Sequence, residues 1–259
     1  MTTQTLSSPS VAPPTAVWDR LWHHAPSDAR DDALLDRERR NPRWTMILRR
    51  LKAAFGATDG LHTIELGSGR GDLSTLLAEH GASVTLLDTS YLALNQARRR
   101  FDRLGLHATY ERGDLFDVGV AQCGRFDVAL SSGVIEHFRG DDRSRAVRAH
   151  YDVLRRGGLA VISVPNARCV PYRLWKLYLE LRGWWPYGLE QPYTRPEMLC
   201  RAKKAGLTDL EARCTGFWQS VGDHWRRSLF GRGPDWVDRA SVIDRLMGMS
   251  LILFGRRGA

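Results

Sequence analysis

The stretch HTIELGSGRGD, residues 62–72, decides the fold, because it joins an apolar run to three closely spaced glycines. Residues 63–66 are predicted to form a buried strand, and residues 72–80 follow with leucines at helical spacing. A strand that enters a glycine-rich turn and then a helix is typical of a nucleotide-binding element. There the backbone approaches the ligand and the helix N-terminus offers free N–H groups. The stretch therefore predicts an α/β domain with a ligand at this turn.

Strands and helices alternate along the rest of the chain. We expect further strands where short apolar runs end in turn residues, at 83–87, 107–110, 126–130, 159–164, 207–215 and 249–254. We expect helices where apolar residues recur at helical spacing, at 90–104, 143–154 and 196–205. This alternation predicts a Rossmann-like, mostly parallel sheet with helices on both faces.

Three segments are expected along the chain. Residues 1–16, rich in Ser, Thr and Pro, are predicted to be a disordered tail, and residues 17–58 a helical cap that Pro42 divides into two helices. Residues 59–259 form the sheet domain, with an aromatic-rich insertion at 167–194. Neither a secretory signal nor a membrane span is expected, because the tail lacks a basic start and no apolar run is long enough.

The composition indicates a protein of the reducing cytoplasm with a basic surface. The four cysteines form no CxxC pair, so free thiols are expected. The net charge of +9 favours an anionic partner: nucleic acid, a membrane surface or a negatively charged substrate. The basic residues are dispersed, however, which favours the simpler interpretation of a solvated surface. The short cluster Arg98-Arg99-Arg100 is expected on the outer face of a helix.

Carboxylates at the ends of the first three strands narrow the choice of ligand. Asp88 ends the second strand about 20 residues after the glycines, where a carboxylate meets ribose hydroxyls, and Asp114 follows the third strand. Glu65 stands two residues before a GxGxG loop, where its charge would repel a pyrophosphate and attract an ammonium or sulfonium group. This favours S-adenosylmethionine over a dinucleotide. Structural roles stay open: an ion pair with an arginine for Glu65, an N-cap for Asp88, and a turn for Asp114.

The order of the motifs resembles the class I S-adenosylmethionine-dependent methyltransferases over roughly residues 41–215. IELGSGRG resembles the first motif of the family, TLLDTS the second, and RGDLFD the segment that holds the adenine. FDVALSSGVIEHF and LRRGGLAVISVPN resemble the fourth- and fifth-strand motifs. VIEHF and SVPN are similar to the small-molecule branch that includes the ubiquinone-pathway O-methyltransferases. The resemblance implies a seven-stranded sheet with an antiparallel last strand.

The resemblance also implies a role for each residue around the cofactor. Glu65 would hold the ammonium group, and Asp88 would take both ribose hydroxyls. Asp114 would accept from the adenine amino group, beside a backbone N–H of Leu115. The other implied contacts are Arg43 with the methionine carboxylate, the backbone of Gly67, Ser68 and Gly69 with the methionine end, Thr89 and Ser90 with the adenosine, and Ser131 and Ser132 near the sulfonium. No metal site is expected, and Arg70 is expected to be a surface charge.

The candidate catalytic residue is His137, which follows Glu136 in VIEHF. A histidine with a pKa near neutrality could remove a proton from an attacking hydroxyl. Alternatively it is a wall residue that fixes its loop. Many enzymes of this kind need little help from a base, because the sulfonium is already an activated methyl donor and catalysis is mostly alignment.

The aromatic insertion is the candidate element for recognition of the methyl acceptor. A lid over an apolar or aromatic molecule would use Trp175, Tyr178, Leu179, Trp184, Trp185 and Tyr187. Two alternatives stay open. The segment could rest on a membrane through Arg173, Lys176 and Arg182, or it could be a helical hairpin packed on the sheet.

The leading hypothesis is a methyltransferase of small molecules that acts on an oxygen, with nitrogen or carbon as alternatives. An RNA methyltransferase would fit the basic pI of about 9.8, yet strand four ends in LSSGV and not in an Asn/Asp-Pro-Pro-aromatic clamp for a base amino group. A non-catalytic protein that senses the cofactor is the remaining alternative. The sequence predicts no oligomeric state.

Overall fold

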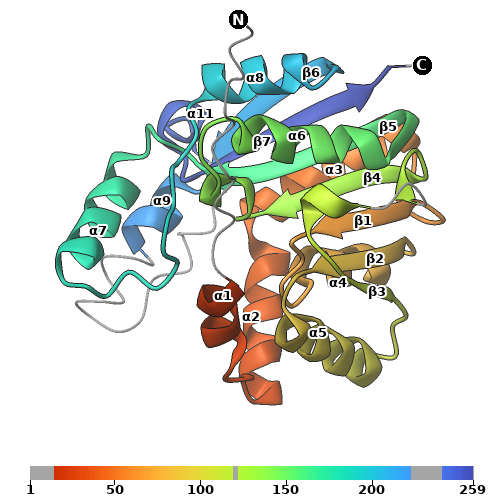
Figure 1. The fold of residues 1–259 in the computed structure, drawn as a ribbon, viewed down its shortest axis with the longest axis horizontal. Helices are drawn as coiled ribbons and strands as arrows, with labels where there is room; N and C mark the ends of the chain where they lie inside the picture. Colours follow the sequence, from red (N-terminus) through yellow and green to blue (C-terminus); the bar gives the residue numbers. More distant parts are fainter. Residues whose placement is uncertain (1–14, 119–121, 223–240, 259) are drawn as a thin grey trace, which may run out of the picture.

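A computed structural model of the chain describes residues 15–118, 122–222 and 241–258. Seven strands form one sheet in the order β3-β2-β1-β4-β5-β7-β6 (Figure 1). The strands are β1 (His62–Leu66), β2 (Ser83–Asp88), β3 (Thr109–Arg112), β4 (Phe126–Ser132), β5 (Leu154–Pro165), β6 (Leu207–Thr215) and β7 (Ser250–Arg257). Only β7 runs antiparallel to its neighbours β5 and β6. The predicted Rossmann-like, mostly parallel sheet with an antiparallel last strand is therefore confirmed.

Helices cover both faces of the sheet, as predicted. One face packs against α2 (Asp28–Arg40), α3 (Pro42–Phe55), α4 (Asp72–Glu79) and α5 (Tyr91–Leu104). The other face packs against α6 (Asp142–Val153) and α8 (Arg195–Lys204). Helix α1 (Thr15–Trp22) and helix α7 (Val170–Leu181) lie beside the sheet, on the side where the parallel strands have their carboxyl ends (Figure 1). The short helices α9 (Phe217–Gln219) and α11 (Asp244–Met247) precede β7.

The central strands are buried on both faces, because their side chains alternate between two apolar layers. On β5, Leu159 and Val161 pack in the layer of α2 to α5, and Ala160 and Ile162 pack in the layer of α6 and α8. These runs carry few polar residues for that reason. The polar residues of the strands gather instead at the strand ends, where the site lies.

Several element boundaries differ from the sequence prediction. Strand β3 begins at Thr109, two residues later than expected, and β4 continues through Ser132. Strand β5 begins at Leu154, because Leu154 pairs with Phe126 across a register shift in β4. The predicted helix 143–154 accordingly ends at Val153. The glycines and arginines at 155–158 hid this start, since they resemble a turn.

Arg100 is not on the outer face of its helix, so that expectation was wrong for one member of the cluster. Arg98 and Arg99 are exposed, but Arg100 is 2% exposed. Its guanidinium donates to Asp31 (Nε to Oδ2, 2.8 Å) and to Asp72 (Nη1 to Oδ1, 2.5 Å). Asp72 begins α4 directly after the glycine loop. The buried arginine therefore ties α2 and α5 to the base of that loop.

Other predictions lie partly or wholly outside the described residues. Residues 1–14 of the predicted tail and residues 223–240 are not described. Cys169, Cys200 and Cys214 are free thiols, as expected, with Cys169 and Cys214 buried. Within the described ranges, no helix combines the length and the apolar character that a membrane span requires.

Candidate functional site

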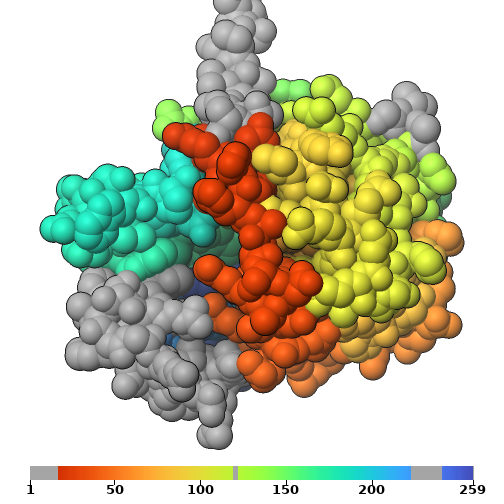
Figure 2. Space-filling view, turned by 90° about the horizontal axis from the view of Figure 1, so that it is seen from below, coloured from red at the N-terminus to blue at the C-terminus, as the bar shows by residue number. Residues whose placement is uncertain are grey.

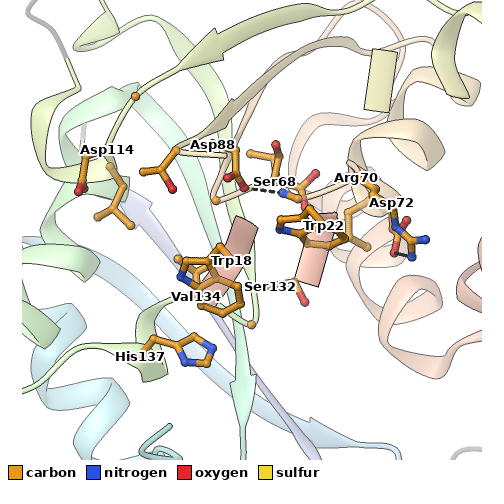
Figure 3. A pocket seen from close by; sticks show the side chains of 18 of the residues that line it. Trp18, Trp22, Ser68, Arg70, Asp72, Asp88, Asp114, Ser132, Val134 and His137 are labelled. Carbon is orange, nitrogen blue, oxygen red and sulfur yellow. Dashed lines mark hydrogen bonds and ion pairs between the residues drawn. The ribbon is translucent and has the colours of Figure 1, made fainter. Parts of the chain in front are cut away.

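A cavity of about 250 Å³ lies at the carboxyl ends of β1, β2, β3 and β4 (Figure 3). Its predicted lining residues are Arg43, Glu65, Gly67, Ser68, Gly69, Asp88, Thr89, Asp114, Leu115, Ser132 and His137. Two predicted residues, Ser90 and Ser131, do not line it. The structure therefore brings together most of the residues that the motifs selected, from positions between 43 and 137. We refer to it as the first cavity.

The loop after β1 needs glycine because side chains from other walls of the first cavity lie very close to its backbone. Gly67 and Gly69 have φ angles of 69° and 54°, which L side chains rarely adopt. A Cβ atom on Gly67 would lie 2.7 Å from Val134 Cγ2, and one on Gly69 would lie 2.9 Å from Trp22 Cζ2. Larger residues would therefore close the space between the loop and these side chains.

The backbone N–H groups of this loop are used inside the protein. Gly67 and Ser68 donate to Leu87 O at 2.8 and 3.0 Å, and Gly69 donates to Asp88 Oδ2 at 2.7 Å. These three N–H groups are therefore not free for a ligand. A phosphate would find few donors in this loop, whereas a cationic group would meet the carboxyl groups of Glu65 and Asp88.

Glu65 lies at the floor of the first cavity and is anchored by α4. Its Oε2 accepts from the backbone N–H and the hydroxyl of Ser74, at 3.0 and 2.5 Å. Burial raises the pKa of Glu65 to about 8, although these hydrogen bonds and the charge of Arg43 oppose the shift. The carboxyl group is thus poised to ionise when a cation enters, because a cation stabilises the charged form.

Asp88 closes the end of β2 with both carboxylate oxygens engaged. Oδ2 accepts from Gly69 N, and Oδ1 accepts from Ser90 N at 2.8 Å. Burial raises its pKa, and the backbone donors oppose that effect. Each oxygen keeps a lone pair for a further donor such as a ribose hydroxyl. The neighbouring Thr89 also lines the first cavity.

Ser90 is a helix cap and not a lining residue. Its hydroxyl oxygen accepts from Ala93 N at 3.4 Å at the start of α5, and the hydroxyl lies 3.0 Å from Asp19 Oδ1 of α1. Ser90 therefore joins two helices that border the first cavity. Its expected contact with the adenosine is not supported by this placement.

Asp114 combines a turn role with a place in the first cavity. Its Oδ1 accepts from Phe116 N at 2.9 Å and caps the short helix Leu115–Asp117. The other oxygen has no hydrogen bond that the described residues provide. Leu115, buried behind it, lines the same end of the first cavity.

Arg43 links helix α3 to the end of β4. Its Nη1 donates to Ser132 Oγ at 2.5 Å, and its Nε and Nη2 donate to Glu38 Oε1 at 3.1 and 2.7 Å. The interaction with Glu38 holds the pKa of the guanidinium above its usual value, against burial. The arginine is thereby fixed at the wall of the first cavity with its charge already balanced.

Ser131 points away from the first cavity, contrary to expectation. Both serines belong to β4, where successive side chains face opposite sides of the sheet. Ser132 faces the first cavity, and Ser131 Oγ lies 2.9 Å from His150 Nε2 on the α6 side. Burial lowers the pKa of His150 to about 4, so its neutral ring accepts from the serine.

His137 lies in the wall of the first cavity as a neutral imidazole. Its Nδ1 hydrogen-bonds to the carbonyl oxygen of Leu189, so this nitrogen carries the proton and Nε2 is left as an acceptor. Burial lowers its pKa to about 4, and Trp18 packs edge-on at 4.8 Å between ring centroids. Such a ring is a weak base near neutral pH, which favours the wall interpretation over the base.

Two tryptophans of α1 complete the first cavity and were not predicted. Trp18 and Trp22 both line it (Figure 3), and Trp22 packs beside Arg70, whose Cζ lies 5.7 Å from the ring centroid. Arg70 therefore lines the first cavity and is not a simple surface charge. In the space-filling view α1 lies between the cyan segment around α7 and the yellow residues around α5 (Figure 2). The sequence did offer one signal for this pair: in VWDRLW, residues 17–22, the two tryptophans are four residues apart and so share one face of a helix.

A second cavity adjoins the first one, and aromatic side chains of the insertion form part of its lining. Its lining residues are Arg43, Ser132, Gly133, Glu136, Ser163, Val164, Pro165, Tyr172, Trp175, Trp185, Tyr187, Met249 and Ser250. Arg43, Ser132 and Gly133 line both cavities. Of the predicted lid, Trp175, Trp185 and Tyr187 face the second cavity, whereas Tyr178 and Trp184 do not line it.

One group of side chains at the second cavity could hold a cation. Glu136, His137 and Glu190 each present a ligand atom, and these atoms lie within 4.8 Å of one another. Burial raises the pKa of Glu136 to about 8, and the nearby charge of Glu190 adds to the shift. A metal ion or an organic cation would relieve this cost. The sequence motifs did not predict this group, because Glu190 is distant in the chain.

Comparisons with known proteins agree with this geometry. A family model described as a methyltransferase domain matches residues 64–158. The ubiquinone biosynthesis O-methyltransferase of Methylobacterium nodulans is 31% identical over 175 residues, which cover 66% of this chain and 68% of that protein. The protein of the same name from Methylobacterium sp. (strain 4-46) is 31% identical over 150 residues, covering 57% of this chain and 59% of that one. This chain thus spans 59–68% of the length of these relatives.

A solved structure shows a similar fold along nearly the whole chain. The 1,6-didemethyltoxoflavin-N1-methyltransferase of Burkholderia thailandensis was solved with 1,6-didemethyltoxoflavin and S-adenosylhomocysteine bound. It matches with a TM-score of 0.60 and 18% identity, covering 98% of this chain and 94% of that one. At this identity the likeness concerns the arrangement of helices and strands.

Proposed function

The chain belongs to the class I S-adenosylmethionine-dependent methyltransferases, and we propose that it methylates an oxygen atom of a small apolar or aromatic molecule. One observation carries the proposal. The first and second cavities share Ser132 and Gly133 at the end of β4. A cofactor in the first cavity and an acceptor in the second would therefore meet at this shared wall.

The first cavity offers the cofactor one complementary group for each of its parts. Glu65 suits the ammonium group, and Asp88 suits the ribose hydroxyls at the end of β2. Asp114 and Leu115 suit the adenine at the far end, since the cavity extends along the strand ends to β3. Arg43, although balanced by Glu38, adds donors for the carboxylate. S-adenosylmethionine supplies an activated methyl group when bound.

Catalysis in this proposal is mainly alignment. The second cavity holds the acceptor oxygen against the shared wall, and the aromatic side chains above it exclude water. The low pKa of His137 makes it a poor general base, so we assign it a positioning role beside Trp18. Because no general base is assigned, the acceptor hydroxyl must itself be acidic enough to lose its proton readily.

The preference for oxygen and for small molecules rests on the relatives and on the cavity walls. The matched relatives are O-methyltransferases by name, at 31% identity. The second cavity is walled by Trp175, Trp185 and Tyr187, which suit a compact acceptor better than a nucleic acid strand. The free cysteines fit the reducing cytoplasm that we propose as the protein's location.

Mass spectrometry of a metabolite extract incubated with the protein and methyl-labelled S-adenosylmethionine tests the proposal. We expect label on the oxygen of a small molecule, together with release of S-adenosylhomocysteine. Label on a nitrogen or carbon atom would contradict the oxygen acceptor, and labelled RNA would contradict the small-molecule acceptor. Cofactor binding without any product would instead favour a non-catalytic sensor.

A further inference from the structure

Glu136 is a buried carboxyl group without a balancing charge at the floor of the second cavity. It is 1% exposed, and its Oε2 has no hydrogen-bond partner among the described residues. In the described part of the chain its sole ion-pair neighbour is His137, whose Nε2 lies 4.0 Å from Oε1. His137 is neutral, so it does not balance the carboxyl group. A buried polar atom without a partner is costly and points to a missing ligand.

The cations that surround Glu136 are each paired with another carboxylate. Arg43 pairs with Glu38 at 2.7 Å, and Arg143 pairs with Glu197 at 3.0 Å. Lys176 pairs with Glu180 one helical turn away. Arg43 and Arg143 reduce the cost of burying Glu136, and Lys176 acts on Glu190, but none of the three forms an ion pair with Glu136.

A second carboxyl group lies close to Glu136 and adds to the negative charge that no cation balances. Glu190 presents an oxygen within 4.8 Å of the ligand atoms of Glu136 and His137. Its hydrogen-bond donor is the hydroxyl of Tyr172, at 2.5 Å, which carries no charge. Glu136, which lines the second cavity, thus has a second carboxyl group close to it, and among the described residues no lysine or arginine forms an ion pair with either one.

The walls above these carboxyl groups are aromatic rings in mutual contact. Ring centroids are 6.1 Å apart for Tyr172 and Trp175, 5.8 Å for Trp175 and Trp185, and 5.1 Å for Trp185 and Tyr187. All four residues line the second cavity. Ring faces attract cations, and Lys176 Nζ already lies 4.9 Å from the centroid of Trp185. Rings around a carboxylate suit an organic ammonium group, which needs both.

We propose that the acceptor carries an ammonium group, which binds in the second cavity between these rings and Glu136. This inference rests on the proposed function in placing the acceptor there. It narrows the acceptor to a hydroxylated amine, with the hydroxyl toward the wall shared with the first cavity and the amine toward Glu136. A metal ion at Glu136, His137 and Glu190 is the competing outcome.

Calorimetry with two isosteric alcohols tests the ammonium site without requiring turnover. Choline and 3,3-dimethylbutan-1-ol have the same shape, but only choline is charged. With the full chain saturated by S-adenosylhomocysteine, we expect choline to bind at least about tenfold more tightly. Glu136→Gln should remove that preference, and Trp185→Leu should weaken choline more than the neutral alcohol.

Controls separate the site from general effects of charge and folding. Glu79→Gln removes the same charge at a site paired with Arg39, away from both cavities, and should keep the preference for choline. If Glu136→Gln alters unfolding, Trp185→Leu provides the independent test. Equal affinity for the two alcohols would overturn the proposal, as would a preference that survives both substitutions. Tight binding of Zn²⁺ or Mn²⁺ that Glu136→Gln abolishes, without a choline preference, would also overturn it.

Turnover assays distinguish a failure of this inference from a failure of the proposed function. Tyramine, 4-ethylphenol and 3-(4-hydroxyphenyl)propionate share a phenol and differ in the charge of the side chain. We expect the lowest KM for tyramine. Methylation of the phenol oxygen without preference for the amine would sink the ammonium site alone. Methylation of the amine nitrogen would contradict both proposals, because it requires a neutral amine at the shared wall and not an ammonium group at Glu136.

Discussion

The first and second cavities meet at one wall but are built differently. The first cavity is built on strand ends, with carboxylates such as Asp88 held by backbone N–H groups of the adjacent loop. The second cavity also uses strand ends, from β4, β5 and β7, but its aromatic wall consists of side chains of α7 and the loop after it, and Tyr187 is 41% exposed. The cofactor side is therefore fixed by the sheet, and the acceptor side depends on packing of aromatic rings.

This difference has a consequence for how substitutions should act. A change in the first cavity removes partners from a preformed set of hydrogen bonds. A change in the aromatic wall of the second cavity removes part of an apolar surface whose rings are partly exposed, so the loss is limited to contact area. We therefore expect larger and more specific losses on the cofactor side than on the acceptor side.

The largest loss of stability is expected for Arg100, which supports the glycine loop of the first cavity through Asp72. Arg100→Met would remove the buried guanidinium that Asp31 and Asp72 share. Asp31 would keep Arg103 at 2.8 Å and Arg70 at 3.7 Å, and the Asp72 side chain is 38% exposed. We therefore expect the free energy of unfolding to fall by about 2–3 kcal/mol, through the lost hydrogen bonds of the buried network. Urea denaturation measures this loss. Arg99→Met, exposed on the same helix, should change stability by less than about 0.5 kcal/mol.

Removal of a cofactor carboxylate should come next. Asp88→Ala should weaken binding of S-adenosylmethionine by about 1–3 kcal/mol, because ribose hydroxyls and the Gly69 N–H lose their acceptor. Calorimetry measures the affinity. The assignment of Asp88 to the ribose is wrong if the affinity is unchanged while the fold is intact.

The pH dependence of cofactor binding should report on Glu65. Its pKa is raised to about 8, so the carboxyl group is protonated at lower pH and must ionise to pair with the cofactor ammonium. Affinity should therefore rise with pH, by up to about tenfold per unit, until the ammonium itself titrates near about 7.7. In Glu65→Gln this slope should vanish between pH 6 and about 7.5. An unchanged slope would assign the titration to another group.

The smallest effect is expected on the acceptor side. Tyr187→Ala should raise the acceptor KM by about fivefold, since a half-exposed ring contributes about 1 kcal/mol, and should leave cofactor affinity unchanged. Trp184→Ala is the matched control, because Trp184 is more exposed and lines neither cavity. Equal effects of the two substitutions would show that the second cavity does not hold the acceptor.

The cofactor side could be predicted because its signals are local. A glycine loop, a carboxylate at a strand end and a turn aspartate each follow from a few neighbouring residues. Predictions failed where one residue of register mattered: Ser131 faces His150 and Ser132 faces the first cavity. The ends of strands are the least certain part of such a pattern, since polar residues continue β4 beyond its apolar run.

Sequence patterns alone predicted a mostly parallel sheet and favoured the kind of cofactor, because strand ends and glycine turns carry their own signatures, and the family resemblance added the antiparallel last strand. Folding decided the rest. Trp22 of α1 lies against Gly69 of the glycine loop, and Glu136 presents its carboxyl group close to that of Glu190. Partners this far apart in the chain leave no spacing to recognise. Only packing of the helices against the sheet brings them within contact distance, and that packing defines the second cavity.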